Sequence, residues 1–351
     1  MVGLKGAAIS AGLETLYFSG AHRLARPVVG GLGAILTFHH VVPPRNDPFQ
    51  PNRGLEVSPA FLNQAIASLV SAGIDIVSID EALRRLREGS KRRFVVLTFD
   101  DGYRDVATFA RPILERHRVP FVLYIASAFA DGEGELWWRT LEEAVVKGEP
   151  IVVTLDGVER AFDCATPRAR SETYRTIYRW LRQREREADL RAAVREIAAR
   201  AGIDMRERCG RTCMGWDALR ELAAHPLVTI GAHTVDHVML AKVPAYEARA
   251  QMADGARRIE AMLGVTPRHF AYPVGDRSAA GTREFAIAAE LGFESAVTTR
   301  PGVLFAEHAR HLAALPRISV NGDFQRLRYL DVLLSGAATA LWNGFARVNA
   351  A

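Results

Sequence analysis

Residues 94–103 read FVVLTFDDGY, in which an almost continuous apolar run is followed by two acids and a glycine. Such a run is typical of a strand buried on both faces of a parallel sheet. Gly102 permits a tight turn, which would bring Asp100 and Asp101 to the carboxyl-terminal edge of that strand. Parallel barrels carry their active sites on this edge. The simpler interpretation is an Asp-Asp-Gly turn that only caps the next helix.

Similar units occur on both sides of this stretch. Strand-like runs occupy residues 33–42, 74–77, 121–126, 227–233, 269–273, 295–299 and 315–320, and helical patterns occupy residues 59–72, 80–87, 106–116, 244–263 and 283–291. Strands that alternate with helices in this way form a parallel sheet covered by helices. About seven such units suit a (β/α) barrel better than an open sheet. The predicted fold class is therefore α/β, with the strands closed into a barrel.

The 351 residues are enough for one large domain or two smaller ones. We expect a lead-in over residues 1–32, a barrel over residues 33–322 and a C-terminal helix over residues 323–351. The alternation breaks at about residues 130–213, where we expect an insertion with a hairpin at Asp156-Gly157. Its part from 168 to 211 holds 13 Arg and 7 acids in a helical pattern. That part is either a solvated helix pair with i,i+4 ion pairs or a surface for an anionic partner.

The composition limits the classes of binding partner and the cellular compartment that we expect. The net charge is +5 and the acids are interspersed, so we expect no nucleic-acid partner, which would favour basic residues clustered with aromatics. Three cysteines form no disulfide framework and predict free thiols in a reducing compartment. We see no signal peptide and no apolar run long enough to span a bilayer. We therefore expect a cytoplasmic protein without a transmembrane segment, and we leave peripheral association with the cell envelope open.

A second polar motif, His233-Thr234-Val235-Asp236-His237, follows the predicted strand at 227–233. Two histidines four residues apart lie on one face of a helical turn, which is a common spacing for metal ligands, although such a pair also arises by chance. Taken together with the paired acids, the motif is more specific. One carboxylate and two imidazoles leave a coordination position for water, as in a hydrolytic metal site.

The motifs TFDDGY and HTVDH, in this order within βα units, resemble those of the NodB-homology polysaccharide deacetylases, carbohydrate esterase family four. The resemblance extends to the segments LTFHHV, FVLYIA, FAYPVGD and LPRISV, and so covers roughly residues 33–320 apart from most of the insertion. It implies a distorted (β/α) barrel, one divalent metal ion and hydrolysis of an N-acetyl group or another acyl amide.

Carried over residue by residue, the resemblance implies that Asp101, His233 and His237 bind the metal and that Asp100 is the general base. Zinc is the expected metal, although the same ligands accept cobalt or other divalent ions. The base would take a proton from water, and the resulting hydroxide would attack the acyl carbon.

The third motif of the family falls on Tyr272, Pro273 and Val274 and departs from the usual pattern. The Arg that orients the base in other members is replaced by Ala271, and Val274 stands where Tyr is usual. The N–H of Val274 could still contact the oxyanion, since a backbone donor needs no particular side chain. Arg317, in LPRISV, is our candidate for the missing Arg.

The residue expected for the general acid also departs from the family pattern. Other members carry it as His in a Leu-x-His motif, where this chain has Arg317. His39 resembles a His seen in one branch of the family and is our candidate acid, although a structural role is equally consistent with its position. Trp137, Trp138 and Trp216 could stack on sugar rings or pack in the core.

The predicted function is a metal-dependent hydrolase that removes N-acetyl groups from an oligosaccharide or polysaccharide containing amino sugars. The same chemistry on another acyl amide, as in a deformylase or a ureide hydrolase, is one alternative. The other is a non-catalytic glycan-binding barrel, which the altered third and last motifs would allow and the intact Asp and His motifs disfavour.

Overall fold

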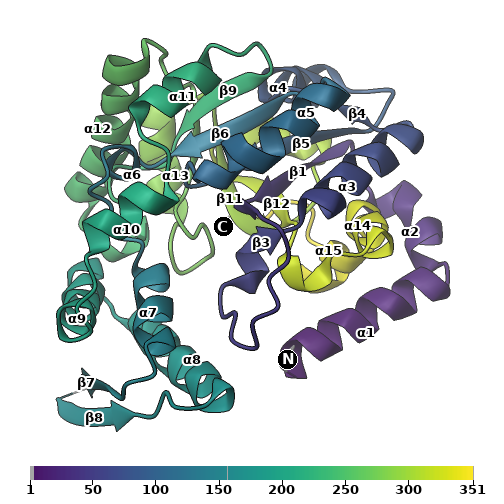
Figure 1. The fold of residues 1–351 in the computed structure, drawn as a ribbon. Coiled ribbons are helices and arrows are strands. Elements are labelled where there is room, and N and C mark those ends of the chain that lie inside the picture. Colours follow the sequence, from purple (N-terminus) through teal and green to yellow (C-terminus); the bar gives the residue numbers. More distant parts are fainter. Residues whose placement is uncertain (1–3, 156, 351) are drawn as a thin grey trace.

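A closed barrel of seven parallel strands forms the centre of the computed structural model, which describes residues 4–155 and 157–350 (Figure 1). Around the barrel, the strands are β1 (Gly33–Phe38), β12 (Leu315–Ser319), β11 (Ser295–Pro301), β10 (His269–Ala271), β9 (Val228–Ala232), β6 (Phe121–Ile125) and β5 (Phe94–Phe99). β5 pairs with β1 and closes the ring, with Phe38 beside Phe99. β4 (Asp75–Ile76) adds to β5 outside the ring. The predicted barrel is confirmed.

Helices between the strands cover the outside of the barrel (Figure 1). They are α3 (Pro59–Ser71), α4 (Ile79–Glu88), α5 (Arg111–His117), α6 (Ser127–Ala130), α11 (Trp216–Ala223), α12 (Ala245–Leu263) and α13 (Thr282–Glu290). Ser58 caps α3 by accepting the N–H of Phe61 at 3.1 Å. The helix expected over 106–116 begins as a π turn at Val106–Ala110, and Pro112 lies at the start of the regular α-helix that follows.

Short elements complete the barrel region. They are the strand pair β2 (His40–Val41) and β3 (Glu56–Val57), and the 3₁₀ turns Arg53–Leu55, Leu240–Lys242, Ala306–Arg310, Leu312–Ala314 and Gly322–Phe324. β2 directly follows the end of β1, so this small parallel pair lies near the carboxyl-terminal edge of the barrel.

The insertion forms a lobe at the lower left of Figure 1. It contains α7 (Trp137–Val146), the antiparallel pair β7 (Ile151–Leu155) and β8 (Val158–Phe162), and the helices α8 (Pro167–Gln183), α9 (Glu187–Arg200) and α10 (Met205–Thr212). The expected hairpin is present, although Asp156 of its turn lies outside the described residues. The expected helix pair is instead three helices, because Asp204 caps a separate third helix by accepting the N–H groups of Arg206 and Glu207.

Both terminal segments are helical and pack together. They form α1 (Leu4–Phe18), α2 (Ala21–Val29), α14 (Leu327–Leu334) and α15 (Ala337–Trp342), so the single helix expected at the C-terminus is two. Gly336 separates these two with a φ of 78°, and a side chain there would collide with the carbonyl oxygen of Val29. No helix of the described residues is long and apolar enough to cross a membrane.

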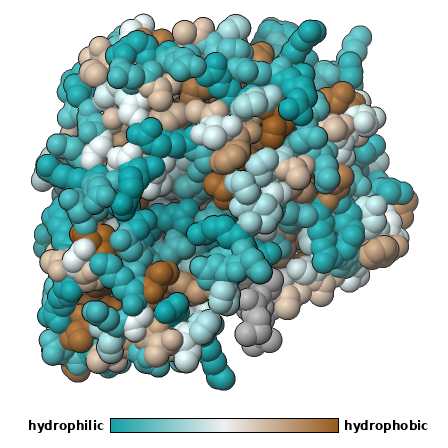
Figure 2. All heavy atoms as spheres, in the orientation of Figure 1, coloured by the Kyte–Doolittle hydropathy of each residue, from teal (hydrophilic) through white to brown (hydrophobic). Residues whose placement is uncertain are grey.

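The apolar core has two main parts, one between the barrel and its helices and one that fills the barrel interior. Val96, Val122 and Tyr124 belong to the second part. The outer surface is mainly hydrophilic in the view of Figure 2, with hydrophobic side chains in smaller areas. Asp100, Asp101 and Arg317 are charged although they are buried in the protein. They lie at or near the carboxyl ends of barrel strands.

Candidate active site

Asp101, His233 and His237 come together at the carboxyl-terminal edge of the barrel. Asp101 lies just after β5, and both histidines follow β9. Oδ1 of Asp101 is 3.4 Å from Nε2 of His233 and 3.3 Å from Nε2 of His237. The backbone of Asp101 (φ 71°) and of His237 (φ 57°) is left-handed, which is uncommon for residues other than glycine. The two turns thus hold unfavourable conformations that bring these three side chains together.

The donor atoms of these residues suit a divalent cation. All three side chains are buried, and their ligand atoms lie within 4.8 Å of one another. Oδ1 of Asp101 has no hydrogen-bond partner in the described part of the chain. Nδ1 of His233 lies 2.6 Å from the carbonyl oxygen of Ala271, so it donates there and leaves Nε2 with a free lone pair. One carboxylate and two imidazoles are a common ligand set for zinc.

Protonation of the cluster also suits a metal site. Burial by itself raises the pKa of Asp101, but His237 and His233 outweigh it and hold that pKa well below its ordinary value. Burial lowers the pKa of His237. Asp101 is therefore ionised and His237 neutral near pH 7, which are the forms that bind metals.

Asp100 is held by Arg317, which reaches it from β12. Nη1 and Nη2 of Arg317 donate to Oδ1 and Oδ2 of Asp100 at 2.8 and 2.7 Å. Nε of Arg317 donates to the carbonyl oxygen of Thr298, and Nη1 also donates to Oγ1 of Thr98. Burial raises the pKa of Asp100, but the Arg317 guanidinium, together with His233 and His39, outweighs burial and holds that pKa below its ordinary value. The carboxylate is thus both oriented and ionised.

His39 lies on the other side of the same carboxylate. Its Nε2 is 4.0 Å from Oδ2 of Asp100, and Oγ1 of Thr37 donates to that oxygen at 3.5 Å. Burial lowers the pKa of His39 and outweighs the two nearby carboxylates, which raise it. The imidazole is therefore neutral near pH 7 and lies within reach of the group that we expect to act as the base.

A cavity of about 440 Å³ opens over this cluster. Its lining includes Thr37, His39, Asp101, His237 and Val274 from the barrel, and Trp137, Trp138, Tyr174, Tyr178 and Arg182 from the insertion. One side of the cavity thus carries the polar groups, and the other carries aromatic rings. A ligand in this cavity would contact both.

The sequence model of the polysaccharide deacetylase family matches residues 87–296, more than half of the chain. The chain belongs to the polysaccharide deacetylase family. It is accordingly an enzyme that hydrolyses carbon–nitrogen bonds other than peptide bonds. A search of curated protein sequences finds no significant match.

Solved structures with the same fold include deacetylases. The chain is similar to the Streptococcus pyogenes deacetylase PplD in complex with acetate, with a TM-score of 0.54 and 18% identity over 82% of this chain and 92% of that one. It is similar to IcaB from Ammonifex degensii with a TM-score of 0.54 and 18% identity, over 86% of this chain and 97% of that one. At such identities the likeness shows the fold alone, which is the distorted barrel expected from the motifs.

In this member of the family, only one of the three third-motif residues reaches the cavity. Val274 lines it with a left-handed backbone (φ 61°). Pro273 is not part of the lining. Tyr272 is fully buried, and its hydroxyl donates to the carbonyl oxygen of Ala313 at 2.8 Å. Ala271, which replaces the usual Arg, provides the carbonyl that holds His233.

The tryptophans separate into two groups. Trp137 and Trp138 line the cavity, and the ring of Trp138 lies 4.9 Å from that of His237. Trp216 is not part of the lining, and its indole N–H donates to Asp131 at 2.7 Å. A stacking role is therefore open to the first two alone.

Sequence reasoning missed the contribution of α8 to the cavity. Tyr174, Tyr178 and Arg182 all line it, and they lie four residues apart along this helix. Such spacing places side chains on one face of a helix, so the signal was present in the sequence. It was hidden by the many arginines of residues 168–211, which suggested a solvated surface. Some of these arginines do pair with acids four residues away, as Arg200 does with Glu196.

Proposed function

We propose that this enzyme removes N-acetyl groups from an oligosaccharide or polysaccharide containing amino sugars, in a reaction that depends on a divalent metal. The observation that carries the proposal is that two adjacent carboxylates, Asp100 and Asp101, have different neighbours. Asp101 faces two histidines, and Asp100 faces an arginine. One carboxylate is thus free to bind a cation while its neighbour acts as a base.

Asp101, His233 and His237 would hold the cation, with zinc as the first choice and cobalt or another divalent ion as alternatives. When bound, such a cation polarises the acyl oxygen and lowers the pKa of water. The three residues support this role because their donor atoms converge and are buried.

Asp100 is our general base. Arg317 donates one hydrogen bond to each of its oxygens. Oδ2 also accepts from Thr37, so Oδ1 is the oxygen that keeps a further lone pair for the proton of an attacking water. Since the carboxylate cannot rotate away from its guanidinium partner, the accepting oxygen keeps one orientation. A base fixed in this way accelerates proton transfer without reorganisation.

His39 and Val274 complete the proposed reaction. His39 lines the cavity beside Asp100 and is our candidate for the acid. Its neutral imidazole would first take up the proton that Asp100 removes from water, and would then give that proton to the departing amine. The N–H of Val274 is our candidate for the donor to the oxyanion that forms on the acyl carbon. Tyr272 and Pro273 directly precede Val274 in the chain and would help to place its N–H.

The aromatic wall supports a carbohydrate substrate. Rings of Trp137, Trp138 and Tyr178 offer flat apolar surfaces beside polar groups, a combination typical of ligand pockets with a defined orientation. The test is acetate release from a panel of N-acetylated oligosaccharides by the metal-loaded enzyme, with His237→Ala as the matched control. Turnover of a formyl amide or a ureide, with no acetate from any glycan, would assign the same chemistry to a different acyl amide.

We also propose a cytoplasmic location. The three cysteines, Cys164, Cys209 and Cys213, are buried and free, which is consistent with a reducing compartment. Fractionation of cells that express the chain, followed by immunoblotting, tests this proposal.

A further inference from the structure

The terminal helices carry an unusual concentration of exposed hydrophobic side chains. Of the twelve large hydrophobic residues that the described chain exposes, seven belong to the terminal segments. They are Phe18, Leu24, Val28, Leu327, Leu341, Trp342 and Phe345. We call the surface formed by these seven residues the terminal face. Leu24 is 82% exposed and Phe18 is 74% exposed, so these side chains do not contribute to the core.

The terminal face is formed by helices in mutual contact. α1 packs against α2, α14 and α15, and α2 packs against α15. Val28 and Phe345 line the same hollow of about 190 Å³. The guanidinium of Arg328 lies 5.8 Å from the ring of Phe18, which ties the end of α1 to α14. Pale and tan spheres lie along the lower right edge of Figure 2, where Figure 1 places α1 and α2.

Positive charge accompanies these apolar side chains. Residues 1–32 and 323–351 together contain six basic and three acidic residues. Arg23 and Arg26 are exposed on α2, and no carboxylate of residues 4–155 and 157–350 lies within ion-pair distance of either. Apolar side chains flanked by arginines suit the boundary between anionic headgroups and acyl chains, where Trp is also favoured.

We propose that the terminal face docks on the surface of a lipid bilayer that contains anionic lipids. Leu24, Val28 and Leu341 would enter the headgroup boundary, and Arg23 and Arg26 would contact the lipid phosphates. A face of this composition binds through buried apolar area and electrostatic attraction together, so binding weakens when salt rises. A second copy of the chain is the competing occupant, and an anionic surface is favoured over it because two copies would bring the same arginines together.

The test is cosedimentation of the full chain with vesicles of phosphatidylcholine, with and without phosphatidylglycerol. We expect binding to the anionic vesicles, reduced at high salt. The double variant Leu24→Ser/Leu341→Ser and the double variant Arg23→Gln/Arg26→Gln should each bind at least several-fold more weakly. Val158→Ser/Tyr246→Ser is the matched control, because it removes exposed hydrophobic residues elsewhere and should bind as the wild type does.

Three results would overturn this proposal. They are no binding of the wild type to anionic vesicles, equal binding by all variants, and a dimer in light scattering that Leu24→Ser/Leu341→Ser abolishes. The last result would assign the face to a contact between copies. Thermal unfolding followed by circular dichroism verifies that each variant is folded.

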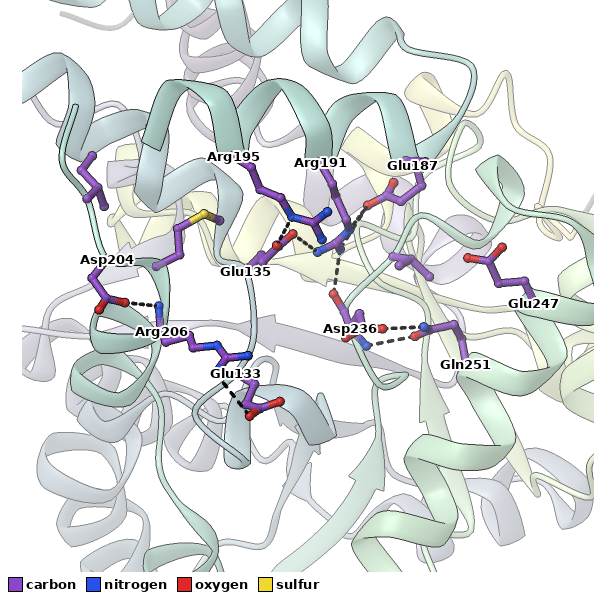
Figure 3. Close-up of a pocket in the computed structure, with 14 residues that line it drawn as sticks. Glu133, Glu135, Glu187, Arg191, Arg195, Asp204, Arg206, Asp236, Glu247 and Gln251 are labelled. Carbon is purple, nitrogen blue, oxygen red and sulfur yellow. Dashed lines mark hydrogen bonds and ion pairs between the residues drawn. The ribbon is translucent and has the colours of Figure 1, made fainter. Parts of the chain in front are cut away.

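A separate observation concerns the back of the metal-ligand loop, residues 233–239. Behind it lies a second cavity of about 640 Å³, lined mainly by charged residues of the insertion and the loop (Figure 3). Arg191 of α9 is 8% exposed, and its Nη2 donates to the carbonyl oxygens of Asp236 and His237 at 2.8 and 3.4 Å. Glu187, one turn earlier, binds Arg191 and accepts the N–H of Met239 at 3.3 Å.

The opposite side of the loop is held by α12. Oε1 of Gln251 accepts the N–H groups of Val235 and Asp236. Nε2 of Gln251 donates to the Asp236 carboxylate at 2.7 Å (Figure 3). The loop is thus fixed from both sides while His237 holds its left-handed backbone. We infer that Arg191 is a positioning residue for His237, and that the insertion therefore supports the metal site as well as lining the cavity. This inference rests on the proposed metal triad.

The test is titration of the metal-free chain with Zn²⁺ by calorimetry, together with the visible spectrum of the Co²⁺ form, which reports ligand geometry. Arg191→Met keeps the apolar stem and removes the donors. Losing a partner that orients a ligand typically lowers metal affinity about 10–100-fold, and we expect that range with an altered Co²⁺ spectrum. Arg191→Lys, which can donate one hydrogen bond, should recover part of the affinity.

Arg195→Ala is the matched control, because Arg195 lies one turn further along α9, pairs with Glu135 and does not contact the loop. It should bind Zn²⁺ as the wild type does. Wild-type affinity and an unchanged spectrum in Arg191→Met would overturn the positioning role of Arg191 but not the metal triad. A wild-type chain that binds no Zn²⁺ would instead overturn the metal triad on which the role depends.

Discussion

Arg317 of β12 and Asp100, at the end of β5, form a two-point ion pair between the two strands that flank β1, with both partners almost fully buried. A guanidinium matches the two oxygens of a carboxylate and so fixes its rotation as well as its charge. The family usually draws this Arg from the third motif, where Ala271 stands here. The pair therefore supplies the same contact to the base from a different strand.

Arg317→Lys should retain the metal and the fold but lose most of kcat, because Lys cannot form both hydrogen bonds. The guanidinium lowers the pKa of Asp100, so its loss raises that pKa. A base must be deprotonated to act, and the acid limb of the pH–rate profile should therefore move to higher pH. Kinetics over a pH series and metal analysis measure both effects. An unchanged kcat with an unchanged acid limb would show that Arg317 does not orient Asp100.

Asp100→Asn should keep the metal and lose turnover by about 10²–10⁴, the usual contribution of a general base. The substitution preserves shape, but the amide cannot accept a proton from water at neutral pH. It also leaves Arg317 buried beside a neutral group, and breaking a buried ion pair typically costs about 3–5 kcal/mol of stability. Activity must therefore be measured below the lowered melting temperature. Wild-type turnover in this variant contradicts the proposed mechanism.

The barrel was predictable because local signals and the fold agree. The apolar run Phe94–Phe99 forms a strand with all six residues buried, and the paired acids lie at its carboxyl end. The position of Arg317 was also predictable, since an Arg within an apolar run is seldom without a partner. In these two segments, the pattern of apolar and charged residues is favourable at only one position in the fold.

The insertion was less predictable because its helices face the cavity on one side and solvent on the other. Tyr174 and Tyr178 of α8 line the cavity, while neighbouring arginines of the same helix face solvent. Arg191 looked like one more solvated charge, but it is buried against the carbonyl oxygens of the His237 loop. Whether such a side chain is buried depends on contacts with segments that are distant in sequence. The periodicity of one helix contains no information about those contacts.

His237→Ala should lose bound metal, because it removes one of three converging donors. Elemental analysis of the purified variant should find less than the one ion per chain expected for the wild type. His225→Ala is a suitable control, since this histidine pairs with Glu115 and is not part of the triad. Full metal occupancy in His237→Ala would remove His237 from the ligand set.

His39→Gln tests the general acid. If His39 protonates the departing amine, its loss should lower kcat by about 10²–10⁴ for an N-acetyl amine. The loss should be smaller for an activated acyl substrate, whose leaving group needs no proton. Equal losses with both substrates would indicate a structural role for His39 through its position 4.0 Å from Asp100.

Tyr178→Ala tests the aromatic wall. Tyr178 lines the cavity and packs against the ring of Trp137, with ring centroids 5.0 Å apart. Its ring contacts in the described part of the chain are with Trp137 and Tyr174, so it should contribute to ground-state and transition-state binding alike. A loss of such uniform binding raises KM and leaves kcat unchanged. We therefore expect a higher KM for N-acetylated oligosaccharides and an unchanged kcat, while Tyr178→Phe, which keeps the ring, should stay near the wild type. A fall in kcat with KM unaltered would show that the insertion acts on the reacting groups and not through substrate binding.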